Sequence, residues 1–276
     1  MPVDLLLVEG EPDAVILGAL LDGSPPVQQR GAKNALKPIA AEEWLRTGRH
    51  VAFVRDRDFD FDPAPSTGPM LGEIRDDRLS EPLGWYWARH EIESYLLDPS
   101  LVALVWPSVA RRDCEEALVG ATCSIRFYEA ARWTIGIARR ALPPQHELKM
   151  RPLDLGDRDL AVPSCLEEGH CREWALRCIG EYLNQVSERV SPFASCQTFA
   201  HKAAMFTDDF CADCESVLIW FSGKDLLAAM GPSLAQLCGA DAGRFRADVR
   251  YWITKHPQET LNVLPGWQML LAYLKK

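Results

Sequence analysis

The sequence lacks both the long apolar segment and the leader that would associate it with a membrane or with export. No apolar run approaches the roughly 20 residues that a membrane-spanning helix needs. The first residues, MPVDLLLVEG, have neither a basic lead nor a small-residue cleavage site, so we expect no signal peptide. We therefore expect a cytoplasmic protein that does not insert into membranes.

Several catalytic signatures are absent as well. No GxSxG, HExxH or GxGxxG motif occurs, so hydrolase-elbow, zinc-peptidase and dinucleotide-binding functions have no support. Positive charge is scarce, because 30 Lys and Arg stand against 39 Asp and Glu, with a net charge of -9. Such a chain is a poor non-specific coat for nucleic acid, although an enzyme can act on nucleic acid through metal ions and a local basic patch. Nine cysteines, an odd number, favour reduced thiols over a disulfide framework.

Short apolar runs alternate with helical patterns over the first hundred residues. Strands separated by helices of this length predict an α/β fold with a parallel sheet flanked by helices. The expected strands are 3–8, 27–30, 50–55 and 83–88, and the expected helices are 14–21 and 35–47. Short helices are expected near 92–96 and 100–106, whereas residues 62–80, rich in Pro, Gly and Asp, predict a loop.

Longer helical patterns dominate after about residue 107. They cover 122–141, 166–189 and 243–255, while 216–221 is a candidate isolated strand. The sequence therefore predicts two domains. Residues 1–106 would form the α/β catalytic domain, and residues 107–276 a mainly helical domain for docking and oligomer contacts.

Carboxylates follow two of the expected strands. Glu9 follows the first strand, and Asp56, Asp58 and Asp60 alternate along VAFVRDRDFDFD after the third. Functional groups gather outside the carboxyl ends of parallel strands, so Glu9, Asp56 and Asp58 should converge if these strands are neighbours. On an extended segment Asp56 and Asp58 would point the same way and could share one Mg²⁺, a cation that prefers oxygen ligands. A solvated acidic turn is the alternative.

These residues resemble a known family. LLVEGEPD followed by FVRDRDFD is similar to the Toprim domain, shared by topoisomerases, bacterial primases, recombination proteins and the OLD-type nucleases. The resemblance implies that Glu9 acts as general acid or base and that Asp56 and Asp58 hold Mg²⁺. With HEIESYLL at 90–97 added, the chain resembles Toprim-like phage-defence nucleases paired with ABC-type ATPases. The resemblance covers 4–62 and 88–98 well and the rest poorly.

The resemblance implies an Mg²⁺- or Mn²⁺-dependent endonuclease that uses one or two ions. Its substrate would be DNA or RNA, tRNA included, and it would be the effector of an anti-phage system with an ABC- or AAA-type ATPase partner. It would act as a homo-oligomer. The alternative is a catalytically silent Toprim-like module that binds a partner ATPase or a nucleotide.

Further residues carry weaker expectations. Glu93 matches a recurrent family Glu and, with Asp60, is a candidate ligand of a second ion, as is Glu91 with less support. A helix N-terminus that favours acidic residues would also explain Glu93. His90 is expected to be a structural hydrogen bonder. Lys224, after Gly223, is a candidate contact for substrate phosphate, and a capped helix start is the alternative.

One cysteine-rich stretch remains. Cys196, His201, Cys211 and Cys214 offer a zinc set with loose spacing, and free buried thiols are the favoured explanation.

Overall fold

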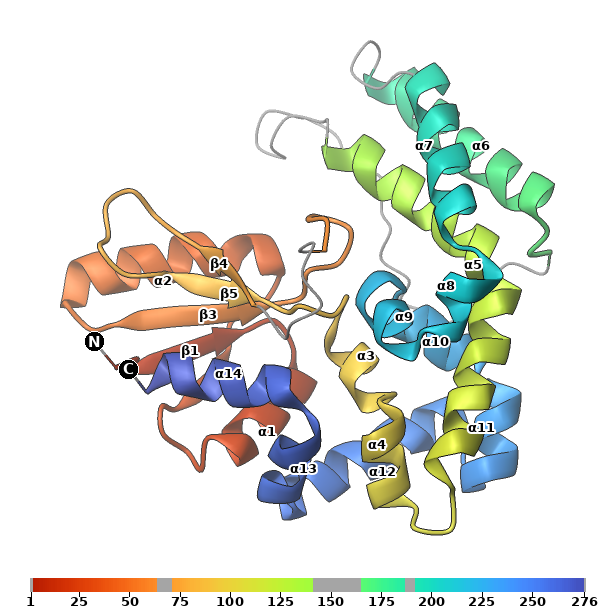
Figure 1. The fold of residues 1–276 in the computed structure, drawn as a ribbon. Helices are drawn as coiled ribbons and strands as arrows, with labels where there is room; N and C mark the ends of the chain where they lie inside the picture. Colours follow the sequence, from red (N-terminus) through yellow and green to blue (C-terminus); the bar gives the residue numbers. More distant parts are fainter. Residues whose placement is uncertain (1, 64–70, 141–164, 187–191, 276) are drawn as a thin grey trace.

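The structure is a computed structural model that describes residues 2–63, 71–140, 165–186 and 192–275 (Figure 1). It confirms the predicted fold class, an α/β unit at the N-terminus followed by a mainly helical C-terminal half. The five strands lie in the order β2-β1-β3-β5-β4. They comprise β1 (Leu5–Val8), β2 (Val27–Gln29), β3 (Val51–Arg55), β4 (Gly72–Ile74) and β5 (Gly84–Tyr86).

The sheet is parallel except at one edge. β1 pairs in parallel with β2 and β3, and β3 pairs in parallel with β5, whereas β4 is antiparallel to β5. β4 lies inside the segment expected to be a loop, so that expectation was wrong for Gly72–Ile74. A three-residue edge strand is too short to show a period-two pattern, and its pairing with β5 is decided by tertiary contacts.

The central strands are buried on both faces because their alternate residues enter two different cores. Leu7 and Phe53 pack with α2 (Lys33–Thr47) in one core. In the other core, Leu6 and Val54 pack with α1 (Glu11–Leu20) and with helices that follow the sheet in the chain. This two-sided burial is the physical reason that β1 and β3 are continuous apolar runs in the sequence.

The remaining elements are helices, and together they form the helical half. They are α3 (Ile92–Leu96), α4 (Pro99–Val105), α5 (Arg111–Arg140), α6 (Glu168–Val186), α7 (Pro192–Met205), α8 (Asp208–Ala212), α9 (Cys214–Trp220), α10 (Gly223–Ala229), α11 (Gly231–Cys238), α12 (Ala242–Lys255), α13 (Pro257–Val263) and α14 (Pro265–Leu274). The long helical patterns expected in this half correspond to α5, α6 and α12.

The strand expected at 216–221 is wrong, since these residues lie in α9 and at its end. The Asp213 side chain accepts a hydrogen bond from the Glu215 backbone N–H and begins the helix, while Val217 and Leu218 are buried. Periodicity cannot separate a strand from a buried helical turn in so short an apolar run.

The end of the chain returns to the sheet, where α14 lies along the β1 side (Figure 1). The Val3 backbone N–H donates to the Leu274 carbonyl oxygen at 3.1 Å. One hydrophobic core contains residues from both sides of position 107, and the domain division expected there stays a prediction. Within the described ranges, no helix is both long enough and apolar enough to cross a membrane.

Leu7→Ala should lower the free energy of unfolding by about 2–5 kcal/mol, because Leu7 is fully buried and its truncation leaves a cavity. Leu45→Ala is the matched control, since Leu45 is 48% exposed on α2 and its truncation should cost less than about 0.5 kcal/mol. Urea denaturation followed by circular dichroism measures both. Equal losses in the two variants would contradict the burial of Leu7.

Candidate functional site

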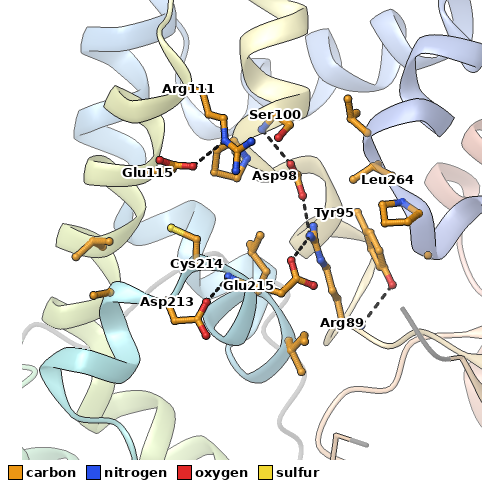
Figure 2. A pocket seen from close by; sticks show the side chains of 18 of the residues that line it. Arg89, Tyr95, Asp98, Ser100, Arg111, Glu115, Asp213, Cys214, Glu215 and Leu264 are labelled. Carbon is orange, nitrogen blue, oxygen red and sulfur yellow. Dashed lines mark hydrogen bonds and ion pairs between the residues drawn. The ribbon is translucent and has the colours of Figure 1, made fainter. Parts of the chain in front are cut away.

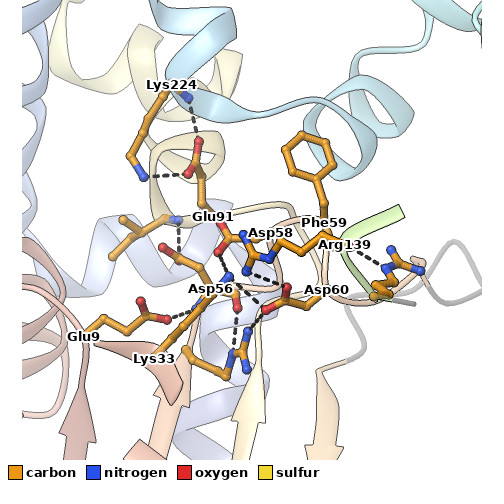
Figure 3. A network of polar contacts seen from close by, with 12 residues as sticks. Glu9, Lys33, Asp56, Asp58, Phe59, Asp60, Glu91, Arg139 and Lys224 are labelled. Atoms are coloured by element: carbon orange, nitrogen blue, oxygen red, sulfur yellow. Dashed lines mark hydrogen bonds and ion pairs between the residues drawn. The ribbon is translucent and has the colours of Figure 1, made fainter. Parts of the chain in front are cut away.

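Acidic side chains meet at the carboxyl ends of β1 and β3. The two strands are hydrogen-bonded neighbours, as the sequence analysis required, with Leu7 opposite Phe53. Glu9 and Asp56 therefore leave the sheet at the same edge (Figure 3). A Glu9 carboxylate oxygen accepts a hydrogen bond from the Asp56 backbone N–H at 3.1 Å, so the structure places Glu9 directly against the acidic segment.

Asp56 and Asp58 do not extend the strand. β3 ends at Arg55, and Asp58 has a φ of 48°, in the left-handed region that Asp tolerates better than most residues. The expectation that the two carboxylates lie side by side on an extended segment was therefore wrong. Asp56 Oδ1 accepts from the Ile92 backbone N–H at 3.2 Å, whereas the Asp58 carboxylate pairs with the Lys33 ammonium group.

Asp60 is held by cations. Its carboxylate lies 2.8 Å from Lys33 Nζ and 3.3 Å from an Arg139 nitrogen, and it also pairs with Arg55. Burial alone would raise its pKa, but Lys33 and the arginines hold the pKa below the ordinary value. Asp60, a candidate second-metal ligand or solvated carboxylate, thus lies in an ion-pair network that ties the acidic segment to α2 and to the end of α5.

A second acidic element comes from the segment before α3. One ligand atom each from Asp58, His90 and Glu91 lie within 4.8 Å of one another, close enough to hold one metal ion. Among the described residues, which include Cys196, His201, Cys211 and Cys214, this is the one such group of three, so the structure does not assemble the zinc set.

His90 differs from the structural hydrogen bonder expected from the sequence. It is 1% exposed, and neither ring nitrogen has a hydrogen-bond partner in the described part of the chain. Burial lowers the pKa of His90 to about 3, so the imidazole is neutral at ordinary pH. A neutral ring with an unused lone pair next to two carboxylates fits a metal ligand.

The start of α10 completes the site from the helical half. The Ser222 hydroxyl and the Lys224 backbone N–H donate to Glu91 Oε1 at 2.9 and 2.7 Å, and Lys224 Nζ lies 2.7 Å from Oε2. Burial would raise the pKa of Glu91, but Lys224 lowers it to about 2. Gly223 is required because a Cβ there would lie 2.3 Å from the Ser94 backbone nitrogen. The Ser222 side chain also accepts a hydrogen bond from the Asp225 backbone N–H, so α10 has the capped start that was the alternative, while a contact of Lys224 with phosphate stays a prediction.

Glu93, a candidate second-metal ligand, is nearly buried and lies outside the group of three. Its carboxylate is 3.9 Å from Lys224 Nζ and 3.9 Å from an Arg246 nitrogen. Burial and then the charge of Glu91 raise the pKa of Glu93 to about 7. Of the two glutamates in this segment, it is Glu91 that lies with Asp58.

Three further carboxyl groups hold protons unusually tightly. Burial and then Asp58 raise the pKa of Glu9 to about 7, and burial and then Asp13 raise that of Asp56 well above its ordinary value. Burial raises the pKa of Asp13, on the first turn of α1, to about 6. Sequence reasoning missed Asp13 as a site residue, and its one signal was its place a helical turn after Glu9. The carboxyl groups in direct contact with a lysine, those of Asp58, Asp60 and Glu91, thus have lowered pKa values, whereas burial raises the pKa values of Glu9, Asp13, Asp56 and Glu93.

A cavity of about 920 Å³ lies away from these residues, between α3, α5, α9 and the α13–α14 junction (Figure 2). Its lining includes none of Glu9, Asp56 and Asp58. Arg89 in its wall pairs with Asp98 at 2.6 Å and with Glu215 at 3.0 Å. These pairs fasten α9 to the α3–α4 region, so we assign the wall a structural role.

Comparison with known proteins does not assign the chain to a family. No protein-family model matches the chain, and a search of curated proteins finds no significant match. The Toprim resemblance therefore rests on the motifs alone and stays an expectation.

Glu9→Gln should make folding less sensitive to pH. Because the pKa of Glu9 is raised, the stability that Glu9 contributes is fully present below about pH 4.5 and is lost as pH rises to about 7, since the unfolded chain loses this proton first. The variant cannot ionise, so at pH 8 it should be more stable than wild type by roughly 1–3 kcal/mol, with no such gain below pH 4.5.

Urea denaturation across pH 4–8.5 measures this difference. Glu42→Gln, at an exposed position on α2, is the matched control and should parallel wild type. A Glu9→Gln curve that also parallels wild type would show that Glu9 has an ordinary pKa.

Proposed function

We propose that the chain is a divalent-metal-dependent nuclease that hydrolyses a phosphodiester bond of nucleic acid. One observation carries the proposal. Carboxylates from β1, β3 and the segment before α3 converge at the carboxyl edge of a parallel sheet, and their pKa values are pushed apart. Such divided protonation is typical of acid–base and metal sites.

The residues present fit a divalent cation. Asp58, His90 and Glu91 would offer two carboxylates and an imidazole to one Mg²⁺ or Mn²⁺, and Asp56, as the sequence predicts, would offer a further oxygen ligand. When bound, the cation polarises the phosphate and lowers the pKa of its water. The buried His90 nitrogens, without hydrogen-bond partners among the described residues, are the structural feature that supports this assignment.

The side chains of the chain itself have distinct roles in the proposed reaction. Glu9, with a pKa of about 7, can take a proton from a water molecule and return one to a leaving oxygen near neutral pH. Lys33 and Lys224 keep Asp58 and Glu91 ionised, and their ammonium groups add positive charge where a phosphate would bind. Lys224 is 34% exposed, so it remains accessible to substrate.

The wider role follows from the resemblance alone. We propose an effector of an anti-phage system that works with an ABC- or AAA-type ATPase and is homo-oligomeric when active. The alternative, a catalytically silent module that binds the ATPase or a nucleotide, is supported by one observation. Lysine ammonium groups already neutralise two of the candidate metal ligands, Asp58 and Glu91.

A cleavage assay distinguishes the nuclease from the catalytically silent module. The chain should cut DNA, RNA or tRNA with Mg²⁺ or Mn²⁺, tested alone and with a candidate ATPase partner. Glu9→Gln and Asp56→Asn should each lower the rate at least about 100-fold, because each removes a proton-transfer or metal-binding group. Asp208→Asn, whose side chain is 84% exposed on α8, is the control and should cut normally. Full activity in Glu9→Gln would remove Glu9 from the mechanism, and no cutting by wild type would favour the silent module.

His90→Leu should selectively weaken Mn²⁺ binding, because an imidazole nitrogen suits transition metals better than Mg²⁺. Leucine preserves the buried volume beside Phe59 but offers no ligand atom. We expect Mn²⁺ affinity, measured by electron paramagnetic resonance, to fall about tenfold or more, with a smaller change for Mg²⁺ measured by calorimetry. Unchanged Mn²⁺ affinity in the folded variant would show that His90 is not a metal ligand.

A further inference from the structure

A second cavity, of about 500 Å³, adjoins the acidic site on the α2 side of the sheet. Its volume lies in the roughly 300–1,000 Å³ range typical of small-ligand sites. Among the described residues, its lining contains four cations, Lys33, Lys37, Arg55 and Arg75, and one acidic residue, Glu73. A local excess of positive charge is unexpected in a chain with a net charge of -9 and indicates an anionic ligand.

Two of these cations are available to a ligand. Lys37 is exposed on α2 and forms no ion pair with any described residue. Arg75 is also exposed, and its only ion pair within the described ranges is with neighbouring Glu73 at 2.7 Å. Exposed ion pairs of this kind are worth little, so a phosphate can compete for the guanidinium group.

An aromatic platform stands beside these cations. The Phe61 ring stacks on Tyr86 with centroids 4.5 Å apart and planes within 8°, and Phe61 is 37% exposed. Tyr86 is fixed in turn over Gly72, where a Cβ would lie only 1.7 Å from the tyrosine ring. Glycine at 72 thus makes room for Tyr86, and Tyr86 supports one face of Phe61.

The cavity and the acidic site share Lys33. This residue lines the cavity and also pairs with Asp58 and Asp60, so a ligand in the cavity lies next to the candidate metal ligands. α2 begins at Lys33 with no acidic residue in its first turn and no side-chain cap, which leaves its positive end open toward an anion.

We propose that this cavity is a nucleotide subsite that binds one base and its phosphate in a nucleic acid strand passing to the metal centre. The base stacks on the exposed part of the Phe61 ring next to Arg55, whose guanidinium carbon lies 5.6 Å from the ring centroid, and the phosphate contacts Lys37 and Arg75. A flat apolar face beside cations is the combination that single-stranded nucleic acid sites use. The inference rests on the proposed function for the identity of the strand as substrate, but binding itself needs no metal.

The test is fluorescence anisotropy of labelled 12-nucleotide DNA and RNA strands with the full chain in EDTA, where cleavage cannot occur. Phe61→Ala and Lys37→Glu should each raise the Kd about tenfold, through lost stacking and reversed charge respectively. Phe61→Trp should stay within about threefold of wild type, because stacking is retained. Phe61 and Lys37 are exposed, so these variants should fold.

Tyr251 and Lys255 on α12 provide the matched control. They form an exposed aromatic–lysine pair, with Lys255 Nζ 5.5 Å from the Tyr251 ring centroid, far along the chain from the cavity. Tyr251→Ala and Lys255→Glu should each leave the Kd within about twofold of wild type. If these controls weaken binding as much as the cavity variants do, strand binding is non-specific and the subsite is overturned.

The remaining outcomes separate the subsite from the nuclease. Wild-type Kd values in Phe61→Ala and Lys37→Glu overturn the subsite, even if the chain cleaves nucleic acid. If strand binding depends on Phe61 and Lys37 but the chain cuts nothing with Mg²⁺ or Mn²⁺, the result supports the subsite and contradicts the proposed nuclease activity. A free mononucleotide that binds while no strand does overturns the subsite.

Discussion

Repulsion among carboxylates at one sheet edge is the constraint on which the rest of this structure depends. Two unit charges about 4 Å apart repel by roughly 4 kcal/mol at an effective dielectric near 20. The chain limits this cost in two ways. Lys33 and Lys224 neutralise Asp58 and Glu91, and burial keeps Glu9 and Asp56 protonated to higher pH than usual. A divalent cation would relieve the same repulsion, which is why we connect the arrangement with metal-dependent chemistry.

The helical half supplies part of the site. Lys224 reaches Glu91 from 133 positions along the chain, and Arg139, at the end of α5, reaches Asp60. Arg57 is buried, and its guanidinium group donates to the Phe61 carbonyl oxygen at 2.8 Å and to that of Ile219 in α9. The acidic segment is therefore held between the sheet and the helices, and its geometry depends on both.

Charge is distributed unevenly around this centre. The chain is acidic overall, and the candidate metal ligands gather at one edge of the sheet, while Lys37, Arg75 and Phe61 lie together on the α2 side. A cation site next to a basic, aromatic surface suits a phosphodiester, because the scissile phosphate needs metal ions while the flanking nucleotide needs cations and a stacking face. Local arrangement, and not net charge, decides which ligand such a protein can bind.

The sequence by itself determined the parallel sheet and the meeting of Glu9 with Asp56, because strands buried on both faces leave continuous apolar runs and parallel strands present their carboxyl ends together. It could not determine the conformation of Asp58, since a single left-handed residue leaves no periodic signal. The sequence offered Glu91 only as a weaker candidate, gave His90 a structural role and missed Asp13, because their surroundings depend on α10 packing against α3 through Gly223 and on burial. The helix α9 was missed because an apolar run of five residues fits a strand or a helix equally well. Long-range packing fixes which groups are buried together, and burial with its neighbouring charges sets their protonation.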